Sequence, residues 1–453
     1  MSVPELLLPA GSLKNMRYAF AYGADAIYAG QPRYSLRVRN NEFNLQNLAI
    51  GINEAHQLHK KFYVVINIAP HNSKLTTFID DITPVVKLQP DALIISDPGL
   101  IMLTKQYFPE MTIHLSVQAN AVNWATVQFW QQQGIARVIL SRELSLNEIA
   151  EIHNKCPDIE LEIFVHGALC MAYSGRCLLS GYINKRDPNQ GTCTNACRWK
   201  YTAHAATEND TGDIIACAAA IDEQCTSPSN EVMLLQEQGR LGQYLPTFED
   251  EHGTYIMNSK DLRAVEHVEQ LVKIGVHSLK IEGRTKSFYY CARTAQVYRQ
   301  AIDDAVNRKA FNPELSKSLE HLAHRGYTAG FLQRHHVGEL QNYDYGYSKS
   351  EHQQLVGEVL GRNEENGLID IAVKNKFEIG DELELMTPKG NQTFILTYME
   401  SAQGAIIKQA KGSGYQVAIS VATHLPLDFA IVLRFLGNDM DTRHPSIQAN
   451  GNN

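Results

Sequence analysis

Short apolar runs rich in β-branched residues alternate with amphipathic stretches over much of the chain, and this alternation restricts the fold more than any other feature. Near-continuous apolar strands separated by helices are typical of parallel strands that are covered on both faces. The helical patterns include residues 13–22, 44–59 and 122–133. The expected strands are Leu6–Leu8, Ala26–Ala29, Phe62–Ile68, Ala92–Ser96, Ile113–Val117, Arg137–Leu140, Leu161–Val165 and Ser278–Ile281.

These eight strands predict an α/β protein with a (β/α)8 domain of the TIM-barrel type. A doubly wound open sheet is the alternative, but no Gly-x-Gly-x-x-Gly turn follows the first strand to support it. Further helices are expected at residues 287–306 and 313–324. From Val356 the apolar period changes to two, which predicts a small C-terminal antiparallel β-barrel.

A chain of 453 residues exceeds what one hydrophobic core usually supports, so several domains are expected. We expect the barrel domain at 1–335 with an irregular insertion at about 202–245, a linker at 336–354, the C-terminal β-barrel at 355–436 and a disordered tail at 437–453. The lack of a signal peptide and of a long apolar run favours a cytoplasmic protein without a membrane span. A net charge of -8 argues against coating of nucleic acid by the whole surface, but it permits a local basic patch.

A cluster of cysteines carries the strongest chemical signal, and its members are Cys170, Cys177, Cys193 and Cys197. Four thiolates are a complete ligand set for an iron–sulfur cluster or a structural zinc ion. Zinc sites usually bring two closely spaced pairs, whereas six and three residues separate the pairs here, which favours iron–sulfur. Glycine, serine and charged neighbours give the segment a loop composition, which argues against the alternative of small core residues.

The cysteines follow the strand at 161–165, so they are expected at the carboxyl end of the barrel, where barrel enzymes carry their active sites. Other polar side chains at strand ends converge on the same end. Each of them has the alternative role of satisfying neighbouring backbone groups. This set comprises Tyr28, Asn67, His114, Gln118, Asn120, Ser141, Arg142, Glu143, His166, Lys280, Glu282 and Arg284.

The chain carries several longer motifs: Glu162-x-Phe164-x-x-Gly167-Ala168-Leu169-Cys170, Gly175-x-Cys177, Cys193-x-x-x-Cys197-Arg198, Leu8-Pro9-Ala10-Gly11 and Lys280-Ile281-Glu282-Gly283-Arg284. These motifs resemble those of the collagenase-like, or U-thirty-two, peptidase family. The resemblance covers essentially the whole chain. It implies an iron–sulfur protein that hydroxylates the wobble uridine of tRNA to 5-hydroxyuridine and depends on prephenate. Sister groups in the family act on rRNA cytidine and on ubiquinone.

The resemblance also implies roles for individual residues. The four cysteines become the ligands of a cluster, expected to be of the 4Fe–4S type. Expected catalytic residues are His166, Glu143 and Glu282. Expected contacts to prephenate, a dicarboxylate that suits the planar fork of arginine, are Arg142, Arg176 and Arg284. Tyr28, Gln118 and Asn120 are further expected substrate-binding residues. Expected contacts to the anticodon region of tRNA are Arg33, Arg37, Arg39, Lys185 and Arg186. Tyr28, Tyr34 and Tyr173 are expected stacking faces for its bases, with a core position as the alternative for Tyr34. Electron-donor or sulfur-assembly proteins are further expected partners.

Two alternative functions remain open at this point. A peptidase needs an activated nucleophile or a metal-held water, but the chain contains neither a Gly-x-Ser-x-Gly nor a His-Glu-x-x-His motif. His166 lies four residues before Cys170 and would pair with its thiol only if that thiol were free of iron. The second alternative is an accessory protein that binds tRNA or prephenate without catalysis.

Overall fold

The structure is a computed structural model that describes residues 3–31, 33–36, 41–169, 260–324, 326–333 and 352–436 with their side chains. Between residues 201 and 254 it describes only the backbone of several short strands. The expected linker at 336–354 lies mostly outside these residues, as does the expected disordered tail at 437–453.

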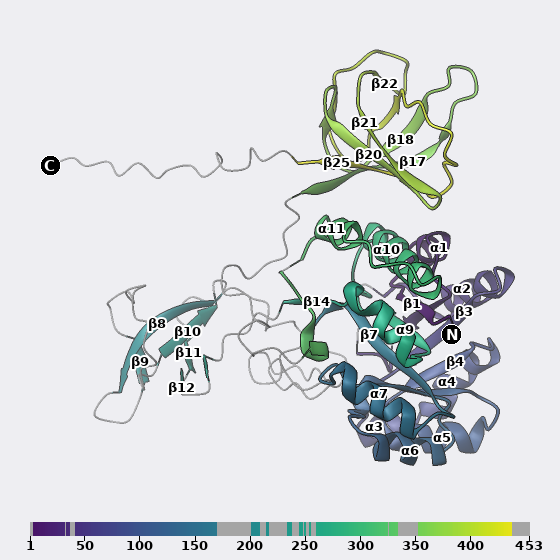
Figure 1. Ribbon diagram of the computed structural model, residues 1–453, viewed down its shortest axis with the longest axis vertical. Coiled ribbons are helices and arrows are strands. Elements are labelled where there is room, and N and C mark those ends of the chain that lie inside the picture. The colour runs from purple at the N-terminus through teal and green to yellow at the C-terminus, as the bar shows by residue number, and fades with distance from the viewer. Residues whose placement is uncertain are drawn as a thin grey trace.

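A closed barrel of parallel strands forms the centre of the first domain (Figure 1). Each strand pairs with the next one along the chain, and the last strand pairs with both the first strand and the seventh, which closes the ring. All eight predicted strands are present, so the TIM-barrel prediction is confirmed. They are β1 (Glu5–Pro9), β2 (Ala26–Gly30), β3 (Lys61–Ile66), β4 (Ala92–Ile95), β5 (Ile113–Leu115), β6 (Arg137–Ile139), β7 (Glu160–Ala168) and β15 (Ser278–Ile281).

Helices cover the outside of the barrel and bury their apolar faces against it. Polar N-caps begin most of them: Ser145, for example, accepts from the backbone of Glu148, and Glu148 bonds back to complete a capping box. The helices are α1 (Leu13–Ala21), α2 (Leu45–Gln57), α3 (Asn72–Leu75), α4 (Phe78–Lys87), α5 (Pro98–Tyr107), η1 (Val117–Ala119), α6 (Trp124–Gln132), α7 (Leu146–Lys155), η4 (Val265–His267), α9 (Val268–Ile274), α10 (Phe288–Val306), α11 (Glu314–Glu320) and η5 (Gly330–Gln333).

Strand β7 extends beyond the barrel at its carboxyl end. It pairs there with β14 (Asp261–Arg263), which in turn pairs with β16 (Tyr327–Thr328). Gly167 lies in this extension with a φ of 108°, and a Cβ at this position would stand 2.5 Å from the carbonyl oxygen of Glu282. The absence of a side chain at Gly167 therefore lets the end of β7 lie directly against the loop that follows β15.

The sequence predicts an irregular insertion at about 202–245, but the structure has regular strands there. The insertion contains an antiparallel sheet in the order β11-β10-β8-β9. The sequence did not indicate these strands because the alternation that marks a strand is weak here, as in the alanine-rich β8. The strands of this region are β8 (Tyr201–Glu208), β9 (Ile214–Ala216), β10 (Met233–Glu237), β11 (Tyr244–Thr247), β12 (Glu249–Asp250) and β13 (Gly253–Thr254).

The C-terminal domain is an antiparallel sheet in the order β21-β20-β25-β17-β18-β24-β22, which curls around its own apolar core (Figure 1). The predicted antiparallel architecture is confirmed. The first strand begins at Gln353, inside the range expected for the linker. The strands are β17 (Gln353–Arg362), β18 (Ile369–Val373), β19 (Phe377–Glu378), β20 (Glu382–Thr387), β21 (Gly390–Ile395), β22 (Met399–Ser401), β23 (Gln409–Ala410), β24 (Gln416–Ile419) and β25 (Ile431–Phe435).

Strand β25 connects the two domains. Val432 belongs to the core of the C-terminal sheet, whereas Ile431 and Leu433 on the opposite face belong to the core of the barrel domain. The hydroxyl of Tyr22 on α1 donates to the carbonyl oxygens of Met386 and Phe429, each at 3.0 Å. Apolar packing and hydrogen bonds therefore hold the C-terminal domain against α1 and α10.

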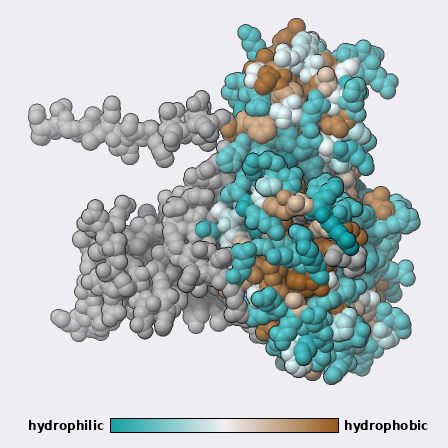
Figure 2. Space-filling view, viewed as in Figure 1, coloured by the Kyte–Doolittle hydropathy of each residue, from teal (hydrophilic) through white to brown (hydrophobic). Residues whose placement is uncertain are grey.

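The face of the molecule in Figure 2 is largely hydrophilic, with hydrophobic residues interspersed between polar ones. Among the helices in the described part of the chain, none combines the length and the apolar character that crossing a bilayer requires.

Candidate active site

The carboxyl ends of the barrel strands define a mouth, and β7 leads from it toward the cysteine cluster. The strand ends at Ala168, whose carbonyl oxygen accepts a 2.8 Å hydrogen bond from Nη1 of Arg142. Cys170 follows two residues later along the chain. The remaining candidates in this region lie outside the described residues: Cys170, Cys177, Cys193, Cys197, Tyr173, Arg176, Lys185, Arg186, Arg37 and Arg39.

Tyr28 and Glu282, both predicted site residues, meet at the mouth. Tyr28 is buried in the middle of β2, and its hydroxyl lies 2.9 Å from the carbonyl oxygen of Ile281 and 3.2 Å from Oε2 of Glu282. Burial and the neighbouring Glu282 carboxylate raise the pKa of the Tyr28 phenol well above its usual value. The phenol is therefore neutral and donates a hydrogen bond to the carboxyl end of β15.

Arg284 joins the same group from the loop after β15. Its Nη1 donates to Oγ of Ser35 at 2.6 Å, and its guanidinium lies 5.8 Å from the centre of the Tyr28 ring. Gly30 makes room for this contact, because a Cβ there would stand 2.5 Å from Oγ of Ser35 and 2.9 Å from Nη1 of Arg284. The structure thus brings together Tyr28, Glu282 and Arg284, as the strand-end argument predicts.

Arg142 lies on the β6 and β7 side of the mouth, with its guanidinium 4.0 Å from the centre of the Phe164 ring. Among the described residues, its Nε is buried without a hydrogen-bond partner. The same holds for Nδ1 of His114 on β5 and Oγ of Ser141 directly after β6. Buried polar atoms are nearly always paired, so each of these three atoms retains the capacity for one further hydrogen bond.

Three other predicted site residues follow β5 and β6 at the same end of the barrel: the substrate-binding candidates Gln118 and Asn120 and the catalytic candidate Glu143. Gln118 lies half-buried in η1, Asn120 caps η1 in the left-handed conformation with a φ of 52°, and Glu143 is half-buried in the turn after β6. Asparagine tolerates this conformation better than most residues, so the chain reverses here without a glycine. These side chains surround the mouth on the β5 and β6 side.

His166 is placed differently from the other catalytic candidates. It is 1% exposed and lies among the rings of Tyr290, Tyr298 and Tyr327, whose centres are 5.8, 5.6 and 5.5 Å from its own. Burial lowers the pKa of the imidazole to about 3. His166 is therefore neutral at physiological pH, and its side chain packs against α10 and β16. Its carbonyl oxygen accepts a 2.8 Å hydrogen bond from the backbone of Glu282 and so supports the mouth.

The buried imidazole of His166 predicts a loss of stability in mild acid. Its pKa is near 3 in the folded protein and near 6.5 when unfolded, so the unfolded chain binds an extra proton between these values. Lowering the pH from 7 to 5 is expected to cost about 2 kcal/mol of unfolding free energy through this group. Urea unfolding of the wild type and of His166→Phe at both pH values measures the effect. His166→Phe should lose most of this pH dependence, and an equally steep loss of stability in wild type and variant would contradict the prediction.

Of the predicted RNA contacts, Arg33 lies within the described residues. It is exposed and forms an ion pair with Asp81 at 2.7 Å. Tyr34 is fully buried, and its hydroxyl donates to Oδ2 of Asp81 at 2.7 Å. Tyr34 is therefore a core residue, the second of its two predicted roles, and does not offer a ring for stacking on a base.

Charged residues inside the barrel are the functional candidates that the strand-end argument missed. Glu5, Arg137 and Glu162 are connected by ion pairs in the barrel interior, below the mouth. The sequence does contain a signal for them, because each is a charged residue within or at the start of an otherwise apolar strand. A charge in such a position is costly unless it is paired.

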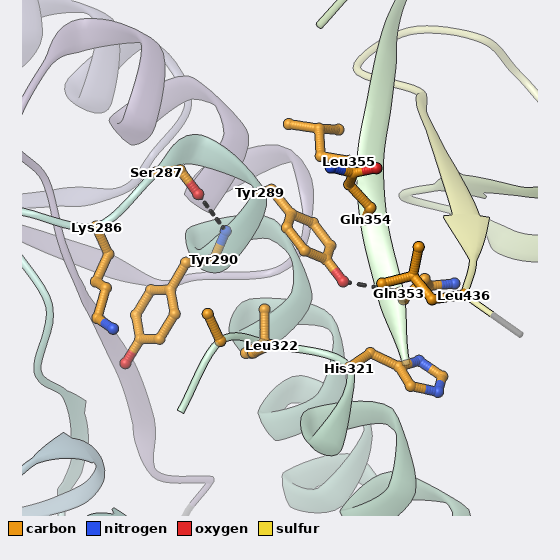
Figure 3. Close-up of a pocket in the computed structure, with 11 residues that line it drawn as sticks. Lys286, Ser287, Tyr289, Tyr290, His321, Leu322, Gln353, Gln354, Leu355 and Leu436 are labelled. Carbon is orange, nitrogen blue, oxygen red and sulfur yellow. Dashed lines mark hydrogen bonds between the residues drawn. The ribbon is translucent and has the colours of Figure 1, made fainter. Parts of the chain in front are cut away.

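A pocket of about 250 Å³ lies between the loop at the mouth, α11 and the C-terminal domain (Figure 3). Its polar groups bond to each other: the hydroxyl of Tyr289 donates to Oε1 of Gln353 at 3.2 Å, and Oγ of Ser287 accepts from the backbone of Tyr290 at 3.3 Å. The hydroxyl of Tyr290 donates to the carbonyl oxygen of Glu282 at 2.6 Å. The N-terminus of α10 thus links the domain interface to the mouth.

Comparison with known proteins places both domains in one family. The model of Peptidase family U32 matches residues 11–342, and that of the Peptidase family U32 C-terminal domain matches residues 351–434. The chain is similar to tRNA hydroxylation protein P of Escherichia coli (strain K12), with 65% identity over 98% of this chain and 99% of the relative. The Haemophilus influenzae protein of the same name is 63% identical over 98% of each chain.

Among solved structures, the C-terminal domain of a Geobacillus thermoleovorans putative U32 peptidase is similar, with 25% identity over 17% of this chain and 96% of that chain and a TM-score of 0.17. The family resemblance seen in the motifs is thus confirmed by matches that extend through the barrel and the C-terminal sheet. The chain belongs to Peptidase family U32.

Proposed function

We propose that this protein hydroxylates tRNA and that it converts the wobble uridine to 5-hydroxyuridine with an iron–sulfur cluster and prephenate. The observation that carries the proposal is the 65% identity to tRNA hydroxylation protein P over 98% of this chain, which includes both domains. The barrel mouth supports it, since polar and cationic side chains from several strands meet where barrel enzymes bind substrate.

The cluster would be held by Cys170, Cys177, Cys193 and Cys197, whose four thiolates are a suitable donor set. The described residues are compatible with this site, because the bond from Arg142 to Ala168 anchors the strand end that leads to Cys170. When bound, a cluster of this kind supplies the redox chemistry that side chains lack.

Prephenate would bind through its carboxylates to arginine side chains. Arg142 and Arg284 approach the mouth from different strands, and the charge of each acts on the Tyr28 phenol between them. Nε of Arg142 is a buried donor without a partner in the described part of the chain, as a carboxylate site requires. Tyr28, Gln118 and Asn120 would add hydrogen bonds, and Arg176 would join from the cysteine segment.

Glu282 is the carboxylate best placed to accept or donate a proton at the mouth, because the Tyr28 hydroxyl holds it there at 3.2 Å. Glu143 would be a second carboxylate on the β6 side. His166, neutral among its tyrosines, would position Glu282 through its backbone. The anticodon region of tRNA would contact Arg33 together with Arg37, Arg39, Lys185 and Arg186.

The described residues do not favour peptidase chemistry. A thiol nucleophile needs a lowered pKa or a neighbouring base. Within the described ranges the cysteines are Cys156 and Cys291, and both are buried. Burial raises the pKa of the Cys156 thiol and raises that of Cys291 to about 12. Neither is an activated nucleophile.

Deletion of the gene tests the proposal. We expect 5-hydroxyuridine and nucleosides derived from it to disappear from purified tRNA, as measured by nucleoside mass spectrometry, and to return when the wild-type gene is supplied. Unchanged nucleosides in the deletion strain would refute the proposal. An accessory role is distinguished by variants of the four cysteines, because an accessory protein without a cluster would keep partial activity.

A further inference from the structure

A chain of buried charges crosses the barrel interior. The Tyr63 hydroxyl donates to Glu5 at 2.7 Å, Nη1 of Arg137 lies 2.6 Å from Glu5 and 3.1 Å from Glu162, and Nζ of Lys280 lies 2.7 Å from Glu162. Arg137, Glu162 and Lys280 are each at most 3% exposed. Barrel interiors are usually filled by branched apolar residues, which cost far less to bury than ions.

Lys280 is the member of this chain nearest to the mouth. Its ammonium lies 4.3 Å from the centre of the Tyr28 ring and 5.4 Å from the centre of the Phe164 ring. Glu162 holds the ammonium in this place, and Arg137 holds Glu162 from the other side. A desolvated cation over an aromatic face is attracted electrostatically to the ring. The position of Tyr28 thus depends on a cation that substrate does not reach.

Tyr28 connects Lys280 to the charged groups of the mouth. Its hydroxyl binds the carbonyl oxygen of Ile281 and the carboxylate of Glu282, and its ring lies 5.8 Å from the guanidinium of Arg284. Glu282 and Arg284 also follow Lys280 on the same strand and its loop. A shift of the Tyr28 ring would therefore change a contact of each charged group of the mouth.

We propose that Lys280 is a positioning residue for the site at the mouth: held by Glu162, it fixes the ring of Tyr28 and through it the carboxylate of Glu282 and the guanidinium of Arg284. The consequence for the reaction rests on the proposed function, whereas the effect on Tyr28 does not. An apolar residue at position 280 would cost less to bury, so stability alone does not account for a lysine here.

The test uses a variant that removes the cation without leaving an unpaired charge. In Lys280→Met combined with Glu162→Gln, both members of the ion pair become neutral, and the amide oxygen introduced at position 162 still accepts from Arg137. We expect a folded protein whose crystal structure has the Tyr28 hydroxyl beyond hydrogen-bond distance of Glu282. We expect kcat for tRNA hydroxylation to fall by on the order of tenfold to a hundredfold. KM for tRNA should stay unchanged, because Lys280 is buried below the site. Lys280→Arg keeps the cation and should retain most activity.

Each outcome decides the proposal. An unmoved Tyr28 in the double variant, or wild-type kcat in a folded double variant, would overturn it. Equal losses in Lys280→Arg and in the double variant would do the same, since the positive charge would then be irrelevant. If the wild type itself does not hydroxylate tRNA, the proposed function fails, and the position of Tyr28 in the crystal structure still tests Lys280.

Discussion

Replacing Cys170 with serine is expected to abolish hydroxylation of tRNA and to remove the iron from the purified protein. Cys170 follows the end of β7 by two residues and is the first of four thiolates predicted to hold one cluster. A serine hydroxyl is a much poorer ligand for iron than a thiolate, so the cluster should be lost or become labile. Iron and acid-labile sulfide per protein, the visible spectrum of protein purified without air, and the nucleosides of tRNA from a complemented deletion strain measure the result.

Two cysteines outside the cluster provide matched controls. Cys156 and Cys291 are buried, and their thiols donate to the backbone oxygens of Trp124 and Pro9 at 3.5 and 3.6 Å. Replacing either with alanine should leave the iron content and the hydroxylated fraction of tRNA unchanged, at a cost of about 1 kcal/mol in stability. Full iron and full hydroxylation in Cys170→Ser would remove that cysteine from the site.

The strands of the barrel were predictable because a parallel strand that is covered on both faces is apolar along its whole length. β25 lacks the period-two alternation that is expected from Val356 onward, for a related reason. It packs one face on each domain, so Ala430 to Leu433 is continuously apolar without alternation. The sequence of one segment does not show that its two faces will pack on two different hydrophobic cores, because this depends on how the domains pack together.

The mouth was predictable where residues follow within three positions of a strand, as Arg142, Glu282 and Arg284 do. His166 was not, because β7 continues past the barrel and its register against β15 shifts between Lys280 and Ile281. This shift turns the imidazole toward α10 instead of the barrel axis. The ion pairs of Arg137 and Glu162 also depend on three-dimensional proximity, since the partners lie on different strands.

Replacing Arg293 with methionine is expected to destabilise the protein by about 3–5 kcal/mol. Arg293 on α10 is 1% exposed, and its Nη2 lies 2.6 Å from Glu384 on β20 and 3.2 Å from Oε1 of Gln353 on β17. These three residues join the barrel domain to the C-terminal sheet. Removing the guanidinium leaves the Glu384 carboxylate buried without its counter-charge. Urea unfolding monitored by circular dichroism measures the loss.

A double variant separates the cost of an unpaired charge from that of lost packing. Combining Arg293→Met with Glu384→Leu removes both charges and should recover much of the stability, because apolar side chains can replace a buried ion pair at little cost. The exposed pair Lys317 and Glu314 is the control, and Lys317→Met there should cost less than about 1 kcal/mol. Equal destabilisation by the single and the double variant would show that packing, and not charge pairing, joins the domains here.

The pH dependence of Arg293→Met gives an independent measure of the same pair. Burial alone would raise the pKa of Glu384, but Arg293 overcomes this and holds the pKa below its usual value. Without Arg293 the folded-state pKa should lie above that of the unfolded chain, so the folded variant binds more protons. Its stability should then fall as the pH rises from about 5 to 8, a range in which Glu384 contributes no such slope in the wild type. Unfolding free energies of the two proteins should therefore diverge with rising pH, and a constant difference would mean that Glu384 has found another cation in the interface.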